Sequence, residues 1–242
     1  MNLHGSGPES RRLIDALDAR LAMVHRVAEI DGHLPRDSRM PEWDDDLGER
    51  ARWVRLVGAY DVPGDADEVR LSSSPRRTEI VGATVVHVGA FYGSRRWPAD
   101  RFAEVAQRLA ASGHRVIFTG SADERGRALE VADLAGFAHD TVWAGRLDLA
   151  EFAALIEDAR VIVSADTGAA HLASAYARPS VVLFGPAAPE HWGPPPGPHA
   201  VLTDAARRRG DAFAADPDPA LLAVTPADVL AAVAVVSRLP AD

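Results

Sequence analysis

Apolar, β-branched runs alternate with amphipathic stretches along the last two-thirds of the chain. The runs predict strands at residues 84–89, 114–120, 141–145, 161–165 and 181–185. The stretches between and after them predict helices at 98–113, 122–136, 149–159, 168–177 and 225–239. Strands that alternate with helices of this length form a parallel sheet covered on both faces. We therefore expect residues 80–205 to form a Rossmann-like α/β domain.

Residues 1–79 follow a different pattern. Leu13, Ile14, Leu17 and Leu21 share one side of a helix predicted at 10–21. A second helix is predicted at 41–60, with an apolar side made of Trp43, Leu47, Trp53, Leu56 and Val57. The acidic run 44–46 favours a solvated helix start over a metal cluster. The tract 61–79 is rich in Pro, Asp, Ser and Arg, as in a linker. We expect 1–79 to be a partial first domain with its linker, and 80–242 a second domain with a closing C-terminal helix.

Composition and charge narrow the class of protein. The chain has 242 residues, no cysteine and a net charge of −9, and all 26 basic residues are arginine. An acidic chain does not attract nucleic acid through its overall field, whereas local arginines bind phosphate well. The N-terminus has no apolar signal region, and no apolar run reaches the roughly 18 residues of a membrane helix. We expect a cytoplasmic protein, either free or peripheral to the inner face of the membrane.

Polar and glycine-containing loops follow the predicted strands, at 89–98, 120–125, 144–146, 165–171 and 184–190. Ligands of open parallel sheets bind beyond the carboxyl ends of the strands, so these loops predict one shared site. A helix that starts at Thr167 or Gly168 offers free N–H groups to an anion, and Ala169 and Ala170 keep the approach open. Arg95 and Arg96 are predicted to neutralise the same anion.

The acidic residues of these loops suit a sugar better than a phosphate. Asp166 is predicted either to cap the helix or to accept a hydrogen bond from a sugar hydroxyl, and Glu124 to accept from ribose hydroxyls. Together these positions predict a pocket for a nucleoside diphosphate. Each has a structural alternative: helix capping for 166–168, a hydrogen-bonded structural histidine for His171, a solvated pair for the arginines and a helix-start acid for Glu124. Their convergence on one edge of the sheet favours a binding site.

A dinucleotide-dependent oxidoreductase is the other class that a Rossmann-like domain suggests. The stretch HGSGPES (4–10) matches a G-x-G fingerprint only loosely, and no strand precedes it. The pattern therefore disfavours NAD binding.

The order and spacing of four segments resemble the C-terminal domain of glycosyltransferase family 9, the ADP-heptose:lipopolysaccharide heptosyltransferases and their relatives. The segments are SRRWPADRFAEVAQRL, GSADE, AGRLDLAEFAALIEDARVIVSADTGAAHLASA and RPSVVLFGP. The resemblance is close over residues 84–202 and weak over the first 60 residues.

The resemblance implies a GT-B fold and an inverting, metal-independent transfer of a heptose-like sugar from a nucleoside-diphosphate donor to a glycan or glycolipid, with no cofactor. It implies that Arg95 contacts the donor phosphates, that Glu124 binds the ribose and that Asp166 lies near the transferred sugar. The turn Thr167–Ala170 would bind the diphosphate, and His171 would support that turn.

The chain also departs from the family pattern. Ala187 and Ala188 replace two polar residues of the usual F-G-P-T-D-P segment, and the strand and Gly-Asp loop that carry the proposed general base have no counterpart. Neither Glu9 nor His4 has a motif that supports it as a substitute base. Two interpretations stay open: an N-terminally shortened transferase, or a non-catalytic nucleotide-sugar-binding remnant. A half-missing first domain also predicts either homodimerisation through residues 1–80 or disorder in part of them.

Overall fold

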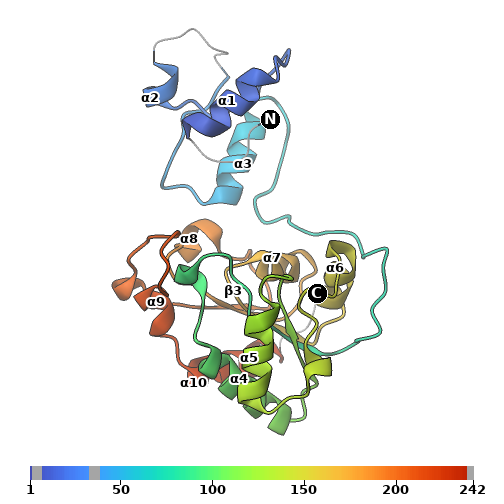
Figure 1. The fold of residues 1–242 in the computed structure, drawn as a ribbon. Helices are drawn as coiled ribbons and strands as arrows, with labels where there is room; N and C mark the ends of the chain where they lie inside the picture. Colours follow the sequence, from blue (N-terminus) through green and yellow to red (C-terminus); the bar gives the residue numbers. More distant parts are fainter. Residues whose placement is uncertain (2–6, 33–38, 239–242) are drawn as a thin grey trace. The chain divides into compact units, whose positions relative to one another are not determined.

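The computed structural model describes residues 1, 7–32 and 39–238, which form two compact units (Figure 1). One unit comprises residues 1–68 with 190–192, and the other comprises 69–189 with 193–242. Residues 61–79 contain neither helix nor strand. None of the helices in the described ranges is long and apolar enough to cross a membrane.

The second unit is built on a parallel sheet of five strands, in the order β2-β1-β3-β4-β5. The strands are β1 (Thr84–His87), β2 (Val116–Thr119), β3 (Val161–Ala165), β4 (Ser180–Leu183) and β5 (His199–Leu202). Adjacent strands pair in register, Thr84 lying opposite both Val116 and Val161. The α/β class and the parallel sheet expected from the sequence are confirmed.

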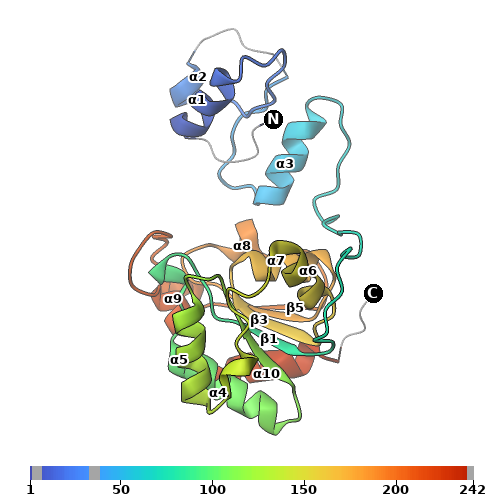
Figure 2. The same ribbon diagram turned by 45° about the vertical axis from the view of Figure 1, so that its right-hand side comes forward.

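Helices cover both faces of this sheet (Figure 2). One face packs against α4 (Ala99–Ala111), α5 (Arg125–Ala135) and α10 (Pro226–Val236), and the other against α6 (Leu149–Glu157) and α7 (Gly168–Ala175). Successive residues of a strand point to opposite faces. Accordingly, Val86 and Val163 lie in the core below α4 and α10, whereas Val85 and Ile162 lie in the core below α6 and α7. The central strands therefore read as unbroken apolar runs.

Local signals fix the helix ends in this unit. Asp148 and Glu151 form a capping box at the start of α6, and Thr225 caps α10 with Pro226 at its first position. Short elements complete the unit: α9 (Pro219–Leu222) and 3₁₀ turns at Gly93–Arg95, His139–Thr141 and Ala205–Arg207. The short helix α8 (Pro189–Trp192) falls mostly within residues 190–192, which belong to the first unit.

Two sheet predictions are corrected. The strand expected at 141–145 reduces to one bridge between Val142 and Phe118, because a 3₁₀ turn precedes it and Gly145, at φ +71°, turns the chain away. The sequence pattern also missed β5, an edge strand whose side chains are only partly buried.

The first unit contains α1 (Pro8–Ala16), α2 (Ala28–Asp31) and α3 (Glu49–Gly58). The predicted apolar side of the first helix is wrong: α1 ends five residues early, and Leu13 and Leu17 are each 71% exposed. The residue that α1 buries is Arg11, whose guanidinium lies 2.8 Å from the Asp31 carboxylate and also donates to the His25 carbonyl at 2.6 Å.

The second predicted helix corresponds to α3, which begins at Glu49 rather than at residue 41. The Trp43 N–H donates to the Arg26 carbonyl at 2.7 Å, and Arg26 and Glu42 form a parallel bridge, which holds this stretch extended. The acidic residues lie in the following turn, where Asp45 accepts a hydrogen bond from the Trp43 indole at 2.7 Å.

We expect Asp31→Ala to destabilise the first unit by about 3–5 kcal/mol, because it leaves the buried Arg11 charge without its partner. Hydrogen exchange of the α1 amides measures this loss. Glu42→Ala is the matched control, since it breaks the exposed Arg26–Glu42 pair, which contributes about 1 kcal/mol or less. Equal losses of stability in the two variants would contradict the conclusion that the buried Arg11–Asp31 pair stabilises this unit more than an exposed pair does.

Candidate functional site

The strand order places a crevice at the carboxyl edge of the sheet. From β1 the chain crosses to β2 on one side, and from there it returns to β3 on the other side of β1. Loops that leave two adjacent strands in opposite directions open a crevice between them, and ligands of open α/β sheets bind there. The loop after β1 carries Arg95, and the loop after β3 carries Asp166 and Thr167.

Asp166 directly follows β3 at this edge of the sheet and is only 6% exposed. Its carboxylate is 3.6 Å from the Arg95 guanidinium and 3.7 Å from Nε2 of His171. Burial raises the pKa of Asp166, and the neighbouring Arg95 and His171 oppose that rise. The structure thus brings together three of the residues singled out in the sequence.

The N-terminus of α7 is open. Thr167 is the N-cap residue, but its side chain makes no capping hydrogen bond, and its hydroxyl lies 2.8 Å from the Ser164 hydroxyl instead. Gly168 is exposed, and a Cβ added there would meet nothing within 4 Å, whereas Ala169 and Ala170 are buried. The first N–H groups of a helix have no partner within it. This turn therefore presents unsatisfied donors and a partial positive charge to an anion.

The two vicinal arginines differ. Nη1 of Arg95 also lies 3.5 Å from the Asp166 carbonyl, and its buried Nε has no hydrogen-bond partner among the described residues. Arg96 turns back onto its own loop, where it donates to the carbonyls of Ala90 and Phe91 at 3.0 and 3.2 Å. Arg95 thus has donors to spare at the crevice, whereas Arg96 braces the loop. Trp97, which follows, is fully buried against Phe102.

Glu124 lies at the neighbouring strand end. Its carboxylate accepts a hydrogen bond from the Ser121 N–H at 2.7 Å and lies so close to the β1 loop that a Cβ on Gly89 would come within 2.2 Å of it. A side chain at position 89 would therefore displace the Glu124 carboxylate. Glu124 occupies the N-cap position of α5 without capping the helix through its side chain. One carboxylate oxygen remains for a ligand.

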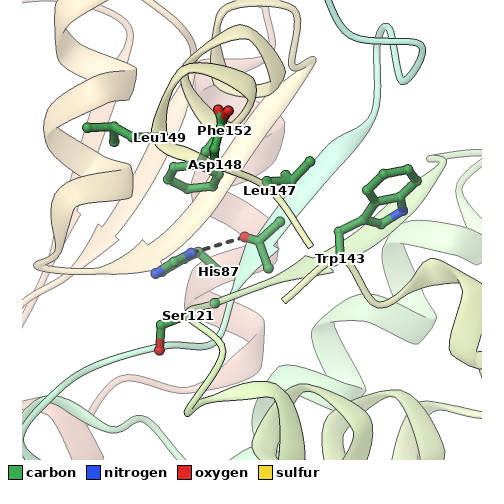
Figure 3. Close-up of a pocket in the computed structure, with 9 residues that line it drawn as sticks. His87, Ser121, Trp143, Leu147, Asp148, Leu149 and Phe152 are labelled. Atoms are coloured by element: carbon green, nitrogen blue, oxygen red, sulfur yellow. Dashed lines mark hydrogen bonds between the residues drawn. The ribbon is translucent and has the colours of Figure 1, made fainter. Parts of the chain in front are cut away.

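A cavity of about 210 Å³ opens at the ends of β1 and β2 (Figure 3), and its lining includes Ser121, whose N–H donates to Glu124. It is lined by His87, Thr119, Gly120, Ser121, Trp143, Leu147, Asp148, Leu149 and Phe152. His87 and Thr119 are hydrogen bonded at 3.0 Å, and the His87 ring lies 5.6 Å from that of Phe152. Burial lowers the pKa of His87 to about 4, so the ring is neutral at pH 7. The cavity combines flat apolar walls with backbone groups, which suits an aromatic ring system.

Sequence reasoning missed this lining. His87 and Trp143 fall within the apolar runs 84–89 and 141–145, to which the sequence pattern assigns no binding role. Each stands near the carboxyl end of its run, where side chains of an open parallel sheet face the ligand. This place near the carboxyl end of a predicted strand is the feature of the sequence that could have marked His87 and Trp143 as part of the site. Phe152 has no such feature, since it looks like any apolar residue of an amphipathic helix.

The sequence profile of Glycosyltransferase family 9 (heptosyltransferase) matches residues 62–209. The chain belongs to glycosyltransferase family 9. All the site residues discussed above lie within this match, and residues 1–61 lie outside it. Curated relatives of this family 9 chain include lipopolysaccharide heptosyltransferase 2 of Salmonella typhimurium, which is 33% identical over 111 residues. That alignment covers 44% of this chain and 32% of the relative. The chain therefore matches about a third of the length of such relatives.

Solved structures of the family support the fold. A family 9 glycosyltransferase from Veillonella parvula matches 98% of this chain with a TM-score of 0.75 and 17% identity, over 72% of its own length. The E. coli ADP-heptose lps heptosyltransferase II matches 79% of this chain with a TM-score of 0.63 and 23% identity, over 62% of its own length. The GT-B-like, Rossmann-like architecture expected from the sequence is thus confirmed.

We expect the substitution Asp166→Asn to raise the melting temperature at pH 8, with a gain that shrinks as the pH falls toward 4. The pKa of Asp166 is raised by folding, so the unfolded chain releases this proton at lower pH than the folded chain. The ionised carboxylate therefore costs stability at high pH and nothing once both states are protonated. Calorimetric melting across this range measures the effect. A gain independent of pH, or a loss at pH 8, would contradict it.

Proposed function

We propose that this chain binds the donor in an inverting, metal-independent glycosyltransferase that moves a heptose-like sugar from a nucleoside diphosphate to a glycan or glycolipid. The proposed donor is ADP-heptose-like. One observation carries the proposal: the Arg95 guanidinium stands beside an uncapped helix N-terminus at the crevice of a family 9 fold. The name of the E. coli relative, which includes ADP-heptose, supports the choice of donor.

The proposed pose follows the order of the groups along the sheet edge. The diphosphate lies on the first turn of α7, where the N–H groups of Gly168 and Ala169 and the Arg95 guanidinium donate to its oxygens. Ala170, also predicted to bind phosphate, already donates its N–H to the Thr167 carbonyl at 3.0 Å and instead keeps this turn small. Arg96 keeps the Arg95 loop in place and adds positive charge. Glu124 accepts from the ribose hydroxyls, and the nucleobase enters the cavity next to it. Asp166 faces the transferred sugar, and His171 holds the Asp166 carboxylate from the helix side.

The proposed reaction is attack by a hydroxyl of the glycan on the anomeric carbon of the donor. The bond from that carbon to the diphosphate breaks, and negative charge develops on the leaving phosphate. Arg95 and the helix N-terminus stabilise this charge, an electrostatic contribution on which such sites depend strongly. A general base removes the hydroxyl proton. Among the candidates weighed from the sequence, Glu9 is exposed on α1, and His4 lies outside the described residues, so we nominate no base.

Association of two chains through residues 1–80 stays a prediction. Leu13, Leu17 and Leu21 supply exposed apolar surface on the first unit, which supports it. The alternative prediction, disorder in part of residues 1–80, stays a prediction as well, and segments 2–6 and 33–38 of this region lie outside the described residues. Peripheral binding to a membrane is likewise a proposal.

We expect Arg95→Ala to weaken ADP binding at least tenfold, because a charge-assisted hydrogen bond contributes about 1.5–3 kcal/mol. Calorimetric titration with ADP, UDP, GDP and NAD measures this effect and identifies the base. Arg108→Ala is the control, since Arg108 lies exposed on α4 and pairs with Glu104 in its own helix. Wild-type protein that bound none of the nucleotides, or NAD in preference to ADP, would overturn the proposal.

We expect turnover of ADP-heptose when the chain is supplied with a lipopolysaccharide preparation that lacks heptose. Nuclear magnetic resonance of the product should show an anomeric configuration opposite to that of the donor, and added EDTA should leave the rate unchanged. ADP-heptose binding without transfer would instead assign the chain as a non-catalytic remnant.

A further inference from the structure

The turn that carries Arg95 is held by a loop more than a hundred residues later in the chain. Ser94 is fully buried and makes three hydrogen bonds to that loop. Its N–H donates to the Ala214 carbonyl at 2.9 Å, its hydroxyl donates to the Ala212 carbonyl at 2.7 Å, and its own carbonyl accepts from the Asp218 N–H at 3.0 Å. Both backbone groups of Ser94, the residue before Arg95, are thus held by hydrogen bonds to this loop.

The fit between the turn and the loop 211–218 leaves no space. A Cβ added to Gly93 would lie 1.6 Å from the Ala215 carbonyl oxygen. Next to it, the rings of Tyr92 and Phe213 meet edge to face, 5.0 Å apart. Any shift of the loop must therefore shift the Arg95 turn.

The loop is itself rigid at its base. The carboxylate of Asp218, a residue that is 3% exposed, accepts hydrogen bonds from the N–H groups of Arg209, Gly210 and Ala220 at 3.1, 3.3 and 2.9 Å. The Arg208 guanidinium donates to the Gly185 carbonyl at 3.1 Å and so ties the loop to the end of β4. The segment 208–218 therefore connects the exits of β1 and β4 at the carboxyl edge of the sheet.

We propose that Ser94 and Asp218 are positioning residues, which set the affinity for the diphosphate by holding the Arg95 guanidinium over the crevice through the loop 211–218. The side-chain contacts of Arg95 are long, at 3.5 and 3.6 Å, and cannot fix it alone. Its position depends on the backbone, and the backbone depends on this loop. The inference rests on the proposed function, since it takes a diphosphate as the ligand of Arg95.

The first test compares Ser94→Ala with Ser180→Ala. Ser180 is also fully buried and makes one side-chain hydrogen bond, to His199 at 2.9 Å, but lies at the amino end of β4. Calorimetric titration should show ADP affinity reduced about five- to tenfold in Ser94→Ala, with adenosine affinity within about twofold of wild type. Ser180→Ala should leave the ratio of the two affinities unchanged, whatever its melting temperature. An unchanged ratio in Ser94→Ala would overturn the proposal.

A second measurement needs no nucleotide. The buried Arg95 Nε–H should exchange slowly with solvent in the wild-type chain and faster in Ser94→Ala and Gly93→Ala, as followed by nuclear magnetic resonance. Equal exchange rates of the Arg95 Nε–H in all three proteins would overturn the proposal that the loop 211–218 positions Arg95. If wild-type protein binds neither ADP nor another nucleoside diphosphate, the proposed function fails, and the exchange result then decides whether the loop positions Arg95.

Discussion

The crossover between β1 and β3 is the constraint on which the site depends. Because the chain leaves these two adjacent strands in opposite directions, their loops turn away from each other above the middle of the sheet, the place where ligands of open α/β sheets bind. The parallel register then brings Arg95 and Asp166 to the same edge, although 71 residues of chain separate them. The middle of each central strand is apolar on both faces, and the residues proposed to bind the ligand stand at the strand exits.

Asp166 shows the conflict between stability and function at this edge. A buried carboxylate that is held about 3.6 Å from its cation gains less from the pair than it loses in hydration, and its raised pKa reports that balance. A fold selected for stability alone would place a neutral residue there. The retained carboxylate is consistent with a contact to a bound sugar. Proteins often keep such destabilising, desolvated groups at functional positions.

The sequence predicted the second unit well because its signals there were mutually consistent. The run 161–165 matches β3 residue for residue, and Thr225 and Pro226 start α10 where their capping chemistry places them. The closeness of Arg95, Asp166 and His171 followed from topology, since parallel strands end at one edge. The cavity could not be predicted, because Phe152 reaches it from a helix whose packing no local pattern reveals. In the first unit, leucine spacing was misleading: the contact that orders α1 is a buried ion pair, which a search for apolar periodicity passes over.

The uncapped start of α7 has a thermodynamic consequence. An N-cap side chain contributes about 1 kcal/mol to a helix, and the free chain forgoes this contribution because the Thr167 hydroxyl is engaged with Ser164. An anion at Gly168 would supply the same hydrogen bonds from outside the chain. Binding of the anion and formation of the first turn of α7 then stabilise each other. The free energy of unfolding should therefore rise with the concentration of the ligand.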